Sequence, residues 1–294
     1  MSYLTEEIAS QPECWAKAIK MAASSEAESA LPRPGERVAA IGCGSSLNIA
    51  RGYATLREAA GQGETDAFPA SEAPLTRRYD RLVFISRTGT TTEVLDALRN
   101  APRDVKTVAV TADPGAPLAQ EADQVVWLDF ATERSVVSSR FITSSIVLLR
   151  AHLGADVRGL PAQAAREVAR PLPPELAGQS EFTFLGRGWA APVADEAALK
   201  LREASRTWAE SYPAMEYRHG PISVSDPATV VWALGEVPAD LLADARRTGA
   251  TVISTGADPL AGLIGAQRLA AALAERKGID PDQPRALSRS VILA

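Results

Sequence analysis

The sequence has few of the residues on which several classes of protein depend. Among its 294 residues there are only 2 cysteines and 2 histidines. Cys14 and Cys43 form no C-x-x-C pair, so a disulfide framework is not expected, and this usage is typical of a reducing cytoplasm. His152 and His219 lie far apart, and no cluster has the spacing of metal ligands. We therefore expect a cytoplasmic protein that uses neither a metal nor a cofactor.

The sequence also lacks long apolar runs and clusters of one charge. No run reaches the roughly 18 apolar residues of a membrane span, and the N-terminus has no basic and apolar stretches typical of a secretory signal. The net charge is −5, with 31 basic and 36 acidic residues spread along the chain. No basic stripe indicates a nucleic-acid surface. An anionic ligand must therefore be bound locally, by loops and helix dipoles, and neither a membrane nor a nucleic acid is an expected partner.

Short apolar runs alternate with helix-like segments along the chain. The expected strands are Val38–Ile41, Leu82–Ile85, Thr107–Val110 and Val125–Leu128, and the expected helices are Leu47–Ala60, Thr92–Asn100 and Pro117–Glu121. This alternation predicts an α/β fold in which a mostly parallel sheet is flanked by helices. Ligands of such sheets bind beyond the carboxyl ends of the strands.

The segment Ile85–Glu93 is the most informative part of the sequence, because hydroxyl side chains crowd the junction between a strand and a helix. Ser86, Thr88, Thr90, Thr91 and Thr92 surround Gly89 there. A helix N-terminus offers free N–H groups and a positive dipole end, and hydroxyls add neutral donors, so the junction suits a phosphate. A simple N-cap would need one hydroxyl only. We therefore predict a phosphate-binding loop.

A second strand-to-helix turn, Gly42–Ser46, has the small residues that allow a ligand to approach the backbone. Ser45 and Ser46 could donate hydrogen bonds to such a ligand. The dinucleotide pattern G-x-G-x-x-G is not met, because Leu47 takes the place of its last glycine.

The second half of the chain repeats the first. The echoing pairs are Ile41–Ser46 with Leu185–Ala190, Val83–Ile85 with Val230–Ala233, and Thr107–Pro114 with Thr251–Pro259. A period this long indicates two tandem domains. The second copy has lost the hydroxyl loop, since Leu234–Pro238 carries Glu236, which would repel phosphate. We expect an N-terminal helical segment at 1–35, a phosphate-binding domain at 36–158, a linker at 159–174 with a short helix at Ala162–Ala169, and a second domain with a C-terminal tail at 175–294.

Three further segments carry chemistry. Glu133–Arg140 precedes a long apolar helix and is interpreted either as the polar cap of that helix or as a wall of the ligand pocket. In the helix-like stretch from Glu196, Lys200 and Glu203 follow at i+4 and i+7, so the three side chains share one face. Such a face is commonly a solvated salt bridge. The next segment, Glu210–Pro221, is expected to be an ordered loop that carries His219, and a carboxylate with an imidazole suffices for proton transfer on a phosphosugar. His152 lies in an apolar helix and is expected to be structural.

Together these segments resemble the double-SIS (sugar isomerase) phosphosugar family, in particular the isomerase half of glutamine–fructose-6-phosphate amidotransferase. The resemblance rests on the Cys43 turn, the Ser86 loop, Leu199–Glu203, His219–Pro221 and Asp282–Leu287. It implies two tandem SIS domains, each with a mostly parallel sheet, and a homodimer with shared active sites.

The resemblance also implies roles for matching positions. Glu203 matches the base that moves a proton between C1 and C2, His219 matches the ring-opening group that reaches in from the neighbouring subunit, and Lys200 matches a lysine on the same helix. The matching substrate contacts are Ser45, Ser46, Ser86, Arg87, Thr88 and Thr91 for the phosphate and the adjoining sugar, and Val136 and Ser138 for sugar hydroxyls.

Two departures from the family pattern widen the possible reactions. No glutaminase segment is found in the sequence, and Arg289 stands where the family's tail carries a lysine. Arginine stays protonated, so it could hold an anion but could not form a Schiff base. We therefore expect an isomerase or deaminase of an amino-sugar 6-phosphate. The alternatives are a deglycase of a fructosamine-type phosphate and a non-catalytic phosphosugar sensor.

Overall fold

The chain folds into two compact units, each built around one sheet. The computed structural model describes residues 2–293. The first-sheet unit comprises Glu13–Glu133, Ser138–Gly159 and the residues from Ser288 onward. The second-sheet unit comprises the residues up to Pro12, the short segment Arg134–Val137, and Leu160–Leu287. Each unit is therefore assembled from three separate stretches of the sequence.

The first sheet is parallel throughout, with the strand order β2-β1-β3-β4-β5. Its strands are β1 (Val38–Gly42), β2 (Thr65–Pro69), β3 (Arg81–Ile85), β4 (Lys106–Thr111) and β5 (Gln124–Trp127). The chain reverses its direction of winding between β1 and β3, which are neighbours with Ile41 paired to Phe84. That reversal is the place where sheets of this kind bind ligands.

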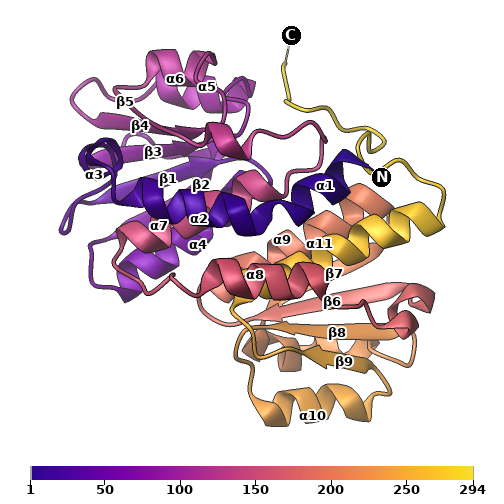
Figure 1. Cartoon of the computed structure of the whole chain (residues 1–294). Helices are drawn as coiled ribbons and strands as arrows, with labels where there is room; N and C mark the ends of the chain where they lie inside the picture. Colours follow the sequence, from indigo (N-terminus) through magenta and orange to yellow (C-terminus); the bar gives the residue numbers. More distant parts are fainter. Residues whose placement is uncertain (1, 294) are drawn as a thin grey trace. The chain divides into compact units, whose positions relative to one another are not determined.

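Helices cover both faces of the first sheet (Figure 1). They are α3 (Ser25–Ala30), α4 (Ser45–Ala59), α5 (Thr92–Arg99), α6 (Pro117–Glu121) and α7 (Arg140–His152). On one face, Val94 and Leu98 of α5 and Leu118 of α6 pack with Ile41 and Phe84 in a buried apolar cluster. The opposite face is covered by α4 and α7 (Figure 1). Burial on both faces explains why the central strands are continuous apolar runs.

The second sheet repeats the order of the first four strands. Its order is β7-β6-β8-β9, again parallel. The strands are β6 (Glu181–Gly186), β7 (Trp208–Pro213), β8 (Thr229–Leu234) and β9 (Thr251–Ser254). The repeat seen in the sequence therefore corresponds to a repeat of strand order.

Helices of the second-sheet unit also lie on both faces of their sheet (Figure 1). They are α8 (Leu160–Ala169), α9 (Ala190–Ser205), α10 (Ala239–Arg247) and α11 (Pro259–Arg276), with the short turns η3 (Pro174–Gly178), η4 (Ala214–His219) and η5 (Pro221–Val224). Leu185 and Val231 pack with Leu241 and Ala245 of α10 and with Tyr217 of η4. On the other face, α9 packs against β6, β7 and α11.

Two edge strands depart from the sequence analysis. The sequence analysis expects no strand at residues 65–69, which form β2. It expects a loop at Glu210–Pro221, and this is wrong at its start because residues 208–213 form β7. Both β2 and β7 lie at an edge of their sheet and are mostly half-buried or exposed. Their sequences therefore carry polar side chains and lack the apolar run that marks a central strand.

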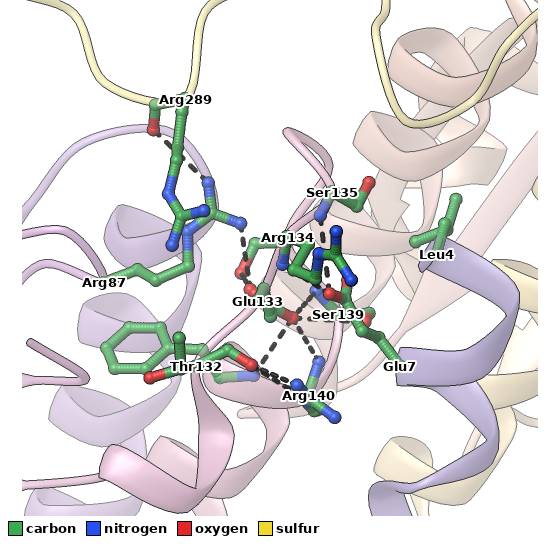
Figure 2. Close-up of polar contacts among 12 residues, drawn as sticks. Leu4, Glu7, Arg87, Thr132, Glu133, Arg134, Ser135, Ser139, Arg140 and Arg289 are labelled. Atoms are coloured by element: carbon green, nitrogen blue, oxygen red, sulfur yellow. Dashed lines mark hydrogen bonds and ion pairs between the residues drawn. The ribbon is translucent and has the colours of Figure 1, made fainter. Parts of the chain in front are cut away.

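The N-terminal helix α1 (Tyr3–Ala9) is fastened to a distant aspartate within the second-sheet unit. The carboxylate of Asp282 accepts hydrogen bonds from the N–H groups of Tyr3 and Leu4, both at 2.8 Å. Farther along α1, the buried carboxylate of Glu7 accepts from the N–H of Arg134 at 2.5 Å (Figure 2). The adjoining helix α2 (Gln11–Ala22) begins with Gln11, whose amide donates to Gln267 at 2.7 Å.

Replacing Asp282 by alanine is expected to lower the free energy of unfolding by about 1 kcal/mol, the usual size of a lost helix cap. Two N–H groups of the first turn of α1 lose their acceptor. Asp282→Asn keeps one side-chain acceptor and should lose less. Urea denaturation of the three proteins checks the order, and equal midpoints for all of them would show that Asp282 does not hold α1.

The structure also bears on the domain boundaries that the sequence analysis expects. The segment expected to link two domains, 159–174, holds α8, and the proposed domain boundaries stay a prediction. Residues 288–293, expected as a tail of the second domain, pack within the first-sheet unit.

Within residues 2–293, no helix is long and apolar enough to cross a bilayer, and no group of three or more potential metal ligands gathers.

Candidate functional site

Two loops meet beyond the carboxyl ends of β1 and β3. The turn after β1 ends at Ser45 and Ser46, the first residues of α4, and Ser46 is buried. At Gly42 an added Cβ would lie 2.9 Å or less from atoms of Ser46, so only glycine allows α4 to start this close to the strand. The loop after β3 begins at Ser86. Because β1 and β3 are neighbours, the sheet brings both predicted phosphate segments to the same edge.

The hydroxyl loop, Ser86–Thr92, is held in shape by its neighbours. Gly89 has φ +61°, and an added Cβ would lie 2.6 Å from Cβ of Ala116, so the position excludes other side chains. The hydroxyl of Ser86, itself buried, accepts from the N–H of Gly89 at 3.2 Å. The carbonyl of Arg87 accepts from the N–H of Ala112 at the end of β4. Thr91 then takes the N-cap position of α5.

The guanidinium of Arg87 lies against a fully buried carboxylate (Figure 2). Its Nη1 lies 2.9 Å from Oε2 of Glu133. Burial alone would raise the pKa of Glu133, but the charge of Arg87 and hydrogen bonds from Ser139 and Ser138 hold it below its ordinary value. The positive charge of Arg87 is therefore matched by the buried carboxylate of Glu133 within the first-sheet unit.

Glu133 also occupies the N-terminus of α7. Its Oε1 accepts from the N–H groups of Ser139 at 2.6 Å and Arg140 at 2.7 Å (Figure 2). Its Oε2 accepts from the hydroxyl of Ser138 at 2.7 Å. Of the two interpretations of residues 133–140, the polar cap is present in the structure. The predicted role of Ser138 as a sugar contact stays a prediction. Val136 belongs to the second-sheet unit, where its N–H donates to the carbonyl of Asp282.

The C-terminal segment Ser288–Leu293 lies on the hydroxyl loop. The carbonyl of Arg289 accepts from Arg87 at 3.3 Å, while the Arg289 residue itself is exposed (Figure 2). The hydroxyl of Ser290 lies within 3.3 Å of the hydroxyls of Thr88, Thr90 and Thr91. A cleft of about 680 Å³ opens beside these contacts. Its lining includes Arg87, Thr88, Thr90, Asp113, Arg289 and Ser290.

The second-sheet unit holds the predicted catalytic residues on α9. The Nζ of Lys200 lies 3.2 Å from Oε1 of Glu196 and 2.5 Å from Oε2 of Glu203. Burial would lower the pKa of Lys200, but the two carboxylates outweigh it and raise the pKa above its ordinary value. Lys200 and Glu196 are buried, whereas the Glu203 side chain is 20% exposed. The i, i+4, i+7 face is therefore an interior ion cluster and not a solvated surface pair, and Glu203 is its accessible end.

His219 lies at the end of η4, apart from that cluster in the sequence. It is exposed, and it is followed by Gly220 with φ +135°. The preceding Arg218 is paired with Asp240 at 2.9 Å and Asp244 at 2.6 Å, which fixes the turn on α10. His152, expected to be structural, is half-buried at the end of α7.

Sequence reasoning missed two residues of the first-sheet site. Glu133 was named only as part of a polar segment, although a carboxylate shortly before an apolar helix can accept from the free N–H groups of its first turn. Ser290 was not singled out. No local pattern identifies it, because its partners lie about 200 positions earlier in the chain.

Comparison with known proteins places part of this chain in a family. Residues 33–153, which contain the first sheet, match the family model of the SIS domain. No second match covers the other sheet, so a second SIS domain stays a prediction. It is supported by the repeated strand order.

Several named proteins are similar to most of the chain. The chain is 27% identical to the isomerizing glutamine–fructose-6-phosphate aminotransferase of Methanothermobacter thermautotrophicus, over 87% of this chain and 51% of that protein. The corresponding protein of Pyrobaculum aerophilum is 31% identical over 72% of this chain and 43% of its own length. The chain thus spans about half the length of these relatives. A solved structure named glucosamine-6-phosphate deaminase, from Thermotoga maritima, is similar over 99% of this chain and all of its own, with TM-score 0.81 and 26% identity.

Proposed function

Because residues 33–153 are an SIS domain, we propose that the chain is an enzyme that binds an amino-sugar 6-phosphate and isomerises or deaminates it. The observation that carries the proposal is the hydroxyl loop at the junction of β3 and α5. Ser86, Thr88 and Thr91 stand there beside the N-terminus of α5. Neutral donors and a helix dipole suit a phosphate dianion on a protein whose net charge is negative. Ser45 and Ser46, at the start of α4, follow the neighbouring strand β1 and lie at the same edge of the sheet.

The reaction is assigned to Glu203. In an aldose–ketose conversion a base removes the proton from C2 and returns it to C1, through an enediol-type intermediate. Glu203 supports this role because its carboxylate is partly exposed while its partner Lys200 is buried, and Lys200 in turn is anchored by Glu196. Lys200 therefore positions the base from inside the unit, and only Glu203 is offered to a ligand.

His219 is proposed as the group that protonates the ring oxygen when the sugar opens. Its exposure on η4 in the single chain supports the family's arrangement, in which this histidine serves the neighbouring subunit of a cytoplasmic homodimer. Arg289 is proposed to hold an anion. Since arginine forms no imine, the proposal contains no covalent step at this position.

A panel of sugar phosphates tests the function. We expect at least one hexosamine 6-phosphate to take up deuterium at C2, or one ketose 6-phosphate at C1, in heavy water, with interconversion or release of ammonia. The same sugars without phosphate serve as the control and should not react, because the hydroxyl loop then has no ligand. Release of another amine from a fructosamine phosphate would identify a deglycase. Binding without any exchange would contradict the enzyme proposal and leave a phosphosugar sensor.

A further inference from the structure

The last turn of α9 carries Glu203 and ends in a buried polar network. Helix α9 ends at Ser205, and both Ser205 and Thr207 are buried. The hydroxyl of Ser205 donates to the carbonyl of Leu201 at 2.7 Å and lies 2.8 Å from the hydroxyl of Thr207. The last carbonyls of a helix have no partner within the helix. A helix end buried in this way therefore depends on donors from another part of the chain.

Lys277 supplies such donors from the end of a second helix. It is the C-cap residue of α11, which packs against α9 within the second-sheet unit (Figure 1). Its Nζ donates to the carbonyl of Ser205 at 2.9 Å and to the hydroxyl of Thr207 at 2.6 Å. Hydrogen bonds from an ammonium group are stronger than those between neutral groups. One side chain thus ties the end of α9 to the end of α11.

The two helix ends share the charge of Lys277. The C-terminus of a helix carries a partial negative charge, which a cation stabilises. The backbone N–H of Lys277 donates to the carbonyls of Leu273 and Ala274 in α11, while its Nζ reaches the last carbonyl of α9. The chain leaves α9 through Arg206, which has φ +51°, a conformation that is unfavourable for residues other than glycine. The ammonium of Lys277 therefore stabilises a helix end that its own sequence supports poorly.

We propose that Lys277 is a positioning residue for Glu203: by holding the last turn of α9, it fixes the backbone from which the Glu203 carboxylate points. This inference rests on the proposed function. Glu203 stands two residues before Ser205, and its carboxylate lies 2.5 Å from Nζ of Lys200. Lys200 thus holds the carboxylate, and Lys277 holds the turn that carries it. A base acts only within hydrogen-bond reach of the proton it removes, so a small displacement of this turn lowers the rate.

Lys277→Met and Lys277→Arg test the inference, with Arg276→Met as the matched control. Arg276 is an exposed cation one residue earlier, in the last turn of α11. Lys277→Met should lower kcat by about 10-fold, the lower end of what a hydrogen bond to a charged group contributes. Kd for fructose 6-phosphate and glucosamine 6-phosphate should stay nearly unchanged, because the proposed phosphate contacts belong to the first-sheet unit. Lys277→Arg should restore kcat, since a guanidinium can donate to both acceptors, and Arg276→Met should behave as the wild type does.

Hydrogen exchange of the ligand-free proteins supplies a readout that needs no activity. The peptide that holds residues 203–207 should exchange faster in Lys277→Met than in the wild type or in Arg276→Met. Thr207→Val, which removes one acceptor of Lys277 with little change of shape, should show the same effects to a smaller degree. This variant replaces Lys277→Met in the test if that protein does not fold.

The outcomes separate this inference from the proposed function. A wild-type kcat in Lys277→Met would overturn the inference and leave the function intact, as would unchanged exchange of the 203–207 peptide. An equal loss of kcat in Arg276→Met, or a rise in Kd that matches the loss of kcat, would also overturn it, because the effect would then be general. If the wild type converted neither sugar phosphate while the exchange difference was present, the function would fall, and Lys277 would stabilise the helix only.

Discussion

Glu203→Gln is expected to lower turnover of the sugar phosphate at least 100-fold, within the range of about 10² to 10⁴ for a lost general base, with Kd for the ligand nearly unchanged. Glutamine has almost the same shape but cannot accept the proton from C2. The variant should fold, because Lys200 keeps its 3.2 Å contact with Glu196. Deuterium exchange at C2 and calorimetric binding measure the two effects separately.

Glu175→Gln is the matched control, since Glu175 is an exposed carboxylate of η3 in the same unit. It should leave both turnover and binding unchanged. If Glu203→Gln lost binding as well as turnover, Glu203 would be a structural member of the Lys200 cluster. If turnover survived, another base would move the proton.

Glu133→Ala is expected to lower the free energy of unfolding by about 3–5 kcal/mol, the usual cost of breaking a buried ion pair from one side. The substitution leaves the buried charge of Arg87 without its carboxylate, and the N–H groups of Ser139 and Arg140 without their acceptor. Glu133→Gln keeps a side-chain oxygen and should lose less. Urea denaturation at pH 7 gives both differences.

The effect of Glu133 should depend on pH in a defined direction. The pKa of Glu133 is held below its ordinary value of 4.5. Its contribution to stability is therefore complete above about pH 4.5 and is lost as the pH falls through the lower, folded-state pKa. The difference in stability between the wild type and Glu133→Gln should shrink on acidification through that range. A difference that stays constant from pH 7 to pH 3 would show that the charge of Glu133 is not what stabilises the fold.

The sequence allowed the central strands to be predicted because burial on both faces leaves a continuous apolar run. Residues 82–85 and 107–110, predicted as strands, are the cores of β3 and β4. The edge strands β2 and β7 could not be found this way. The stretch 208–213 reads as Trp-Ala-Glu-Ser-Tyr-Pro, and it becomes a strand because β6 supplies a parallel partner along its whole length.

The position of the hydroxyl loop could also be predicted, because a strand and a helix flank it directly. The burial of the charged residues on α9 could not be predicted. Lys200 looked like one member of a surface pair, yet it is buried between two carboxylates, and only the packing of α9 decides between the two outcomes. The contact of Ser290 with Thr90 joins residues at opposite ends of the sequence and leaves no local signal.

The bond between Asp282 and α1 has a consequence for the order in which the protein can be completed. Helix α1 is made before the other elements of the two units, and its acceptor is made 278 residues or more later. The first sheet, by contrast, needs only residues 38–127 for all of its strands. During synthesis, the first sheet can therefore be finished while α1 still lacks its partner, and the unit that holds Glu203 closes only once Asp282 has been made.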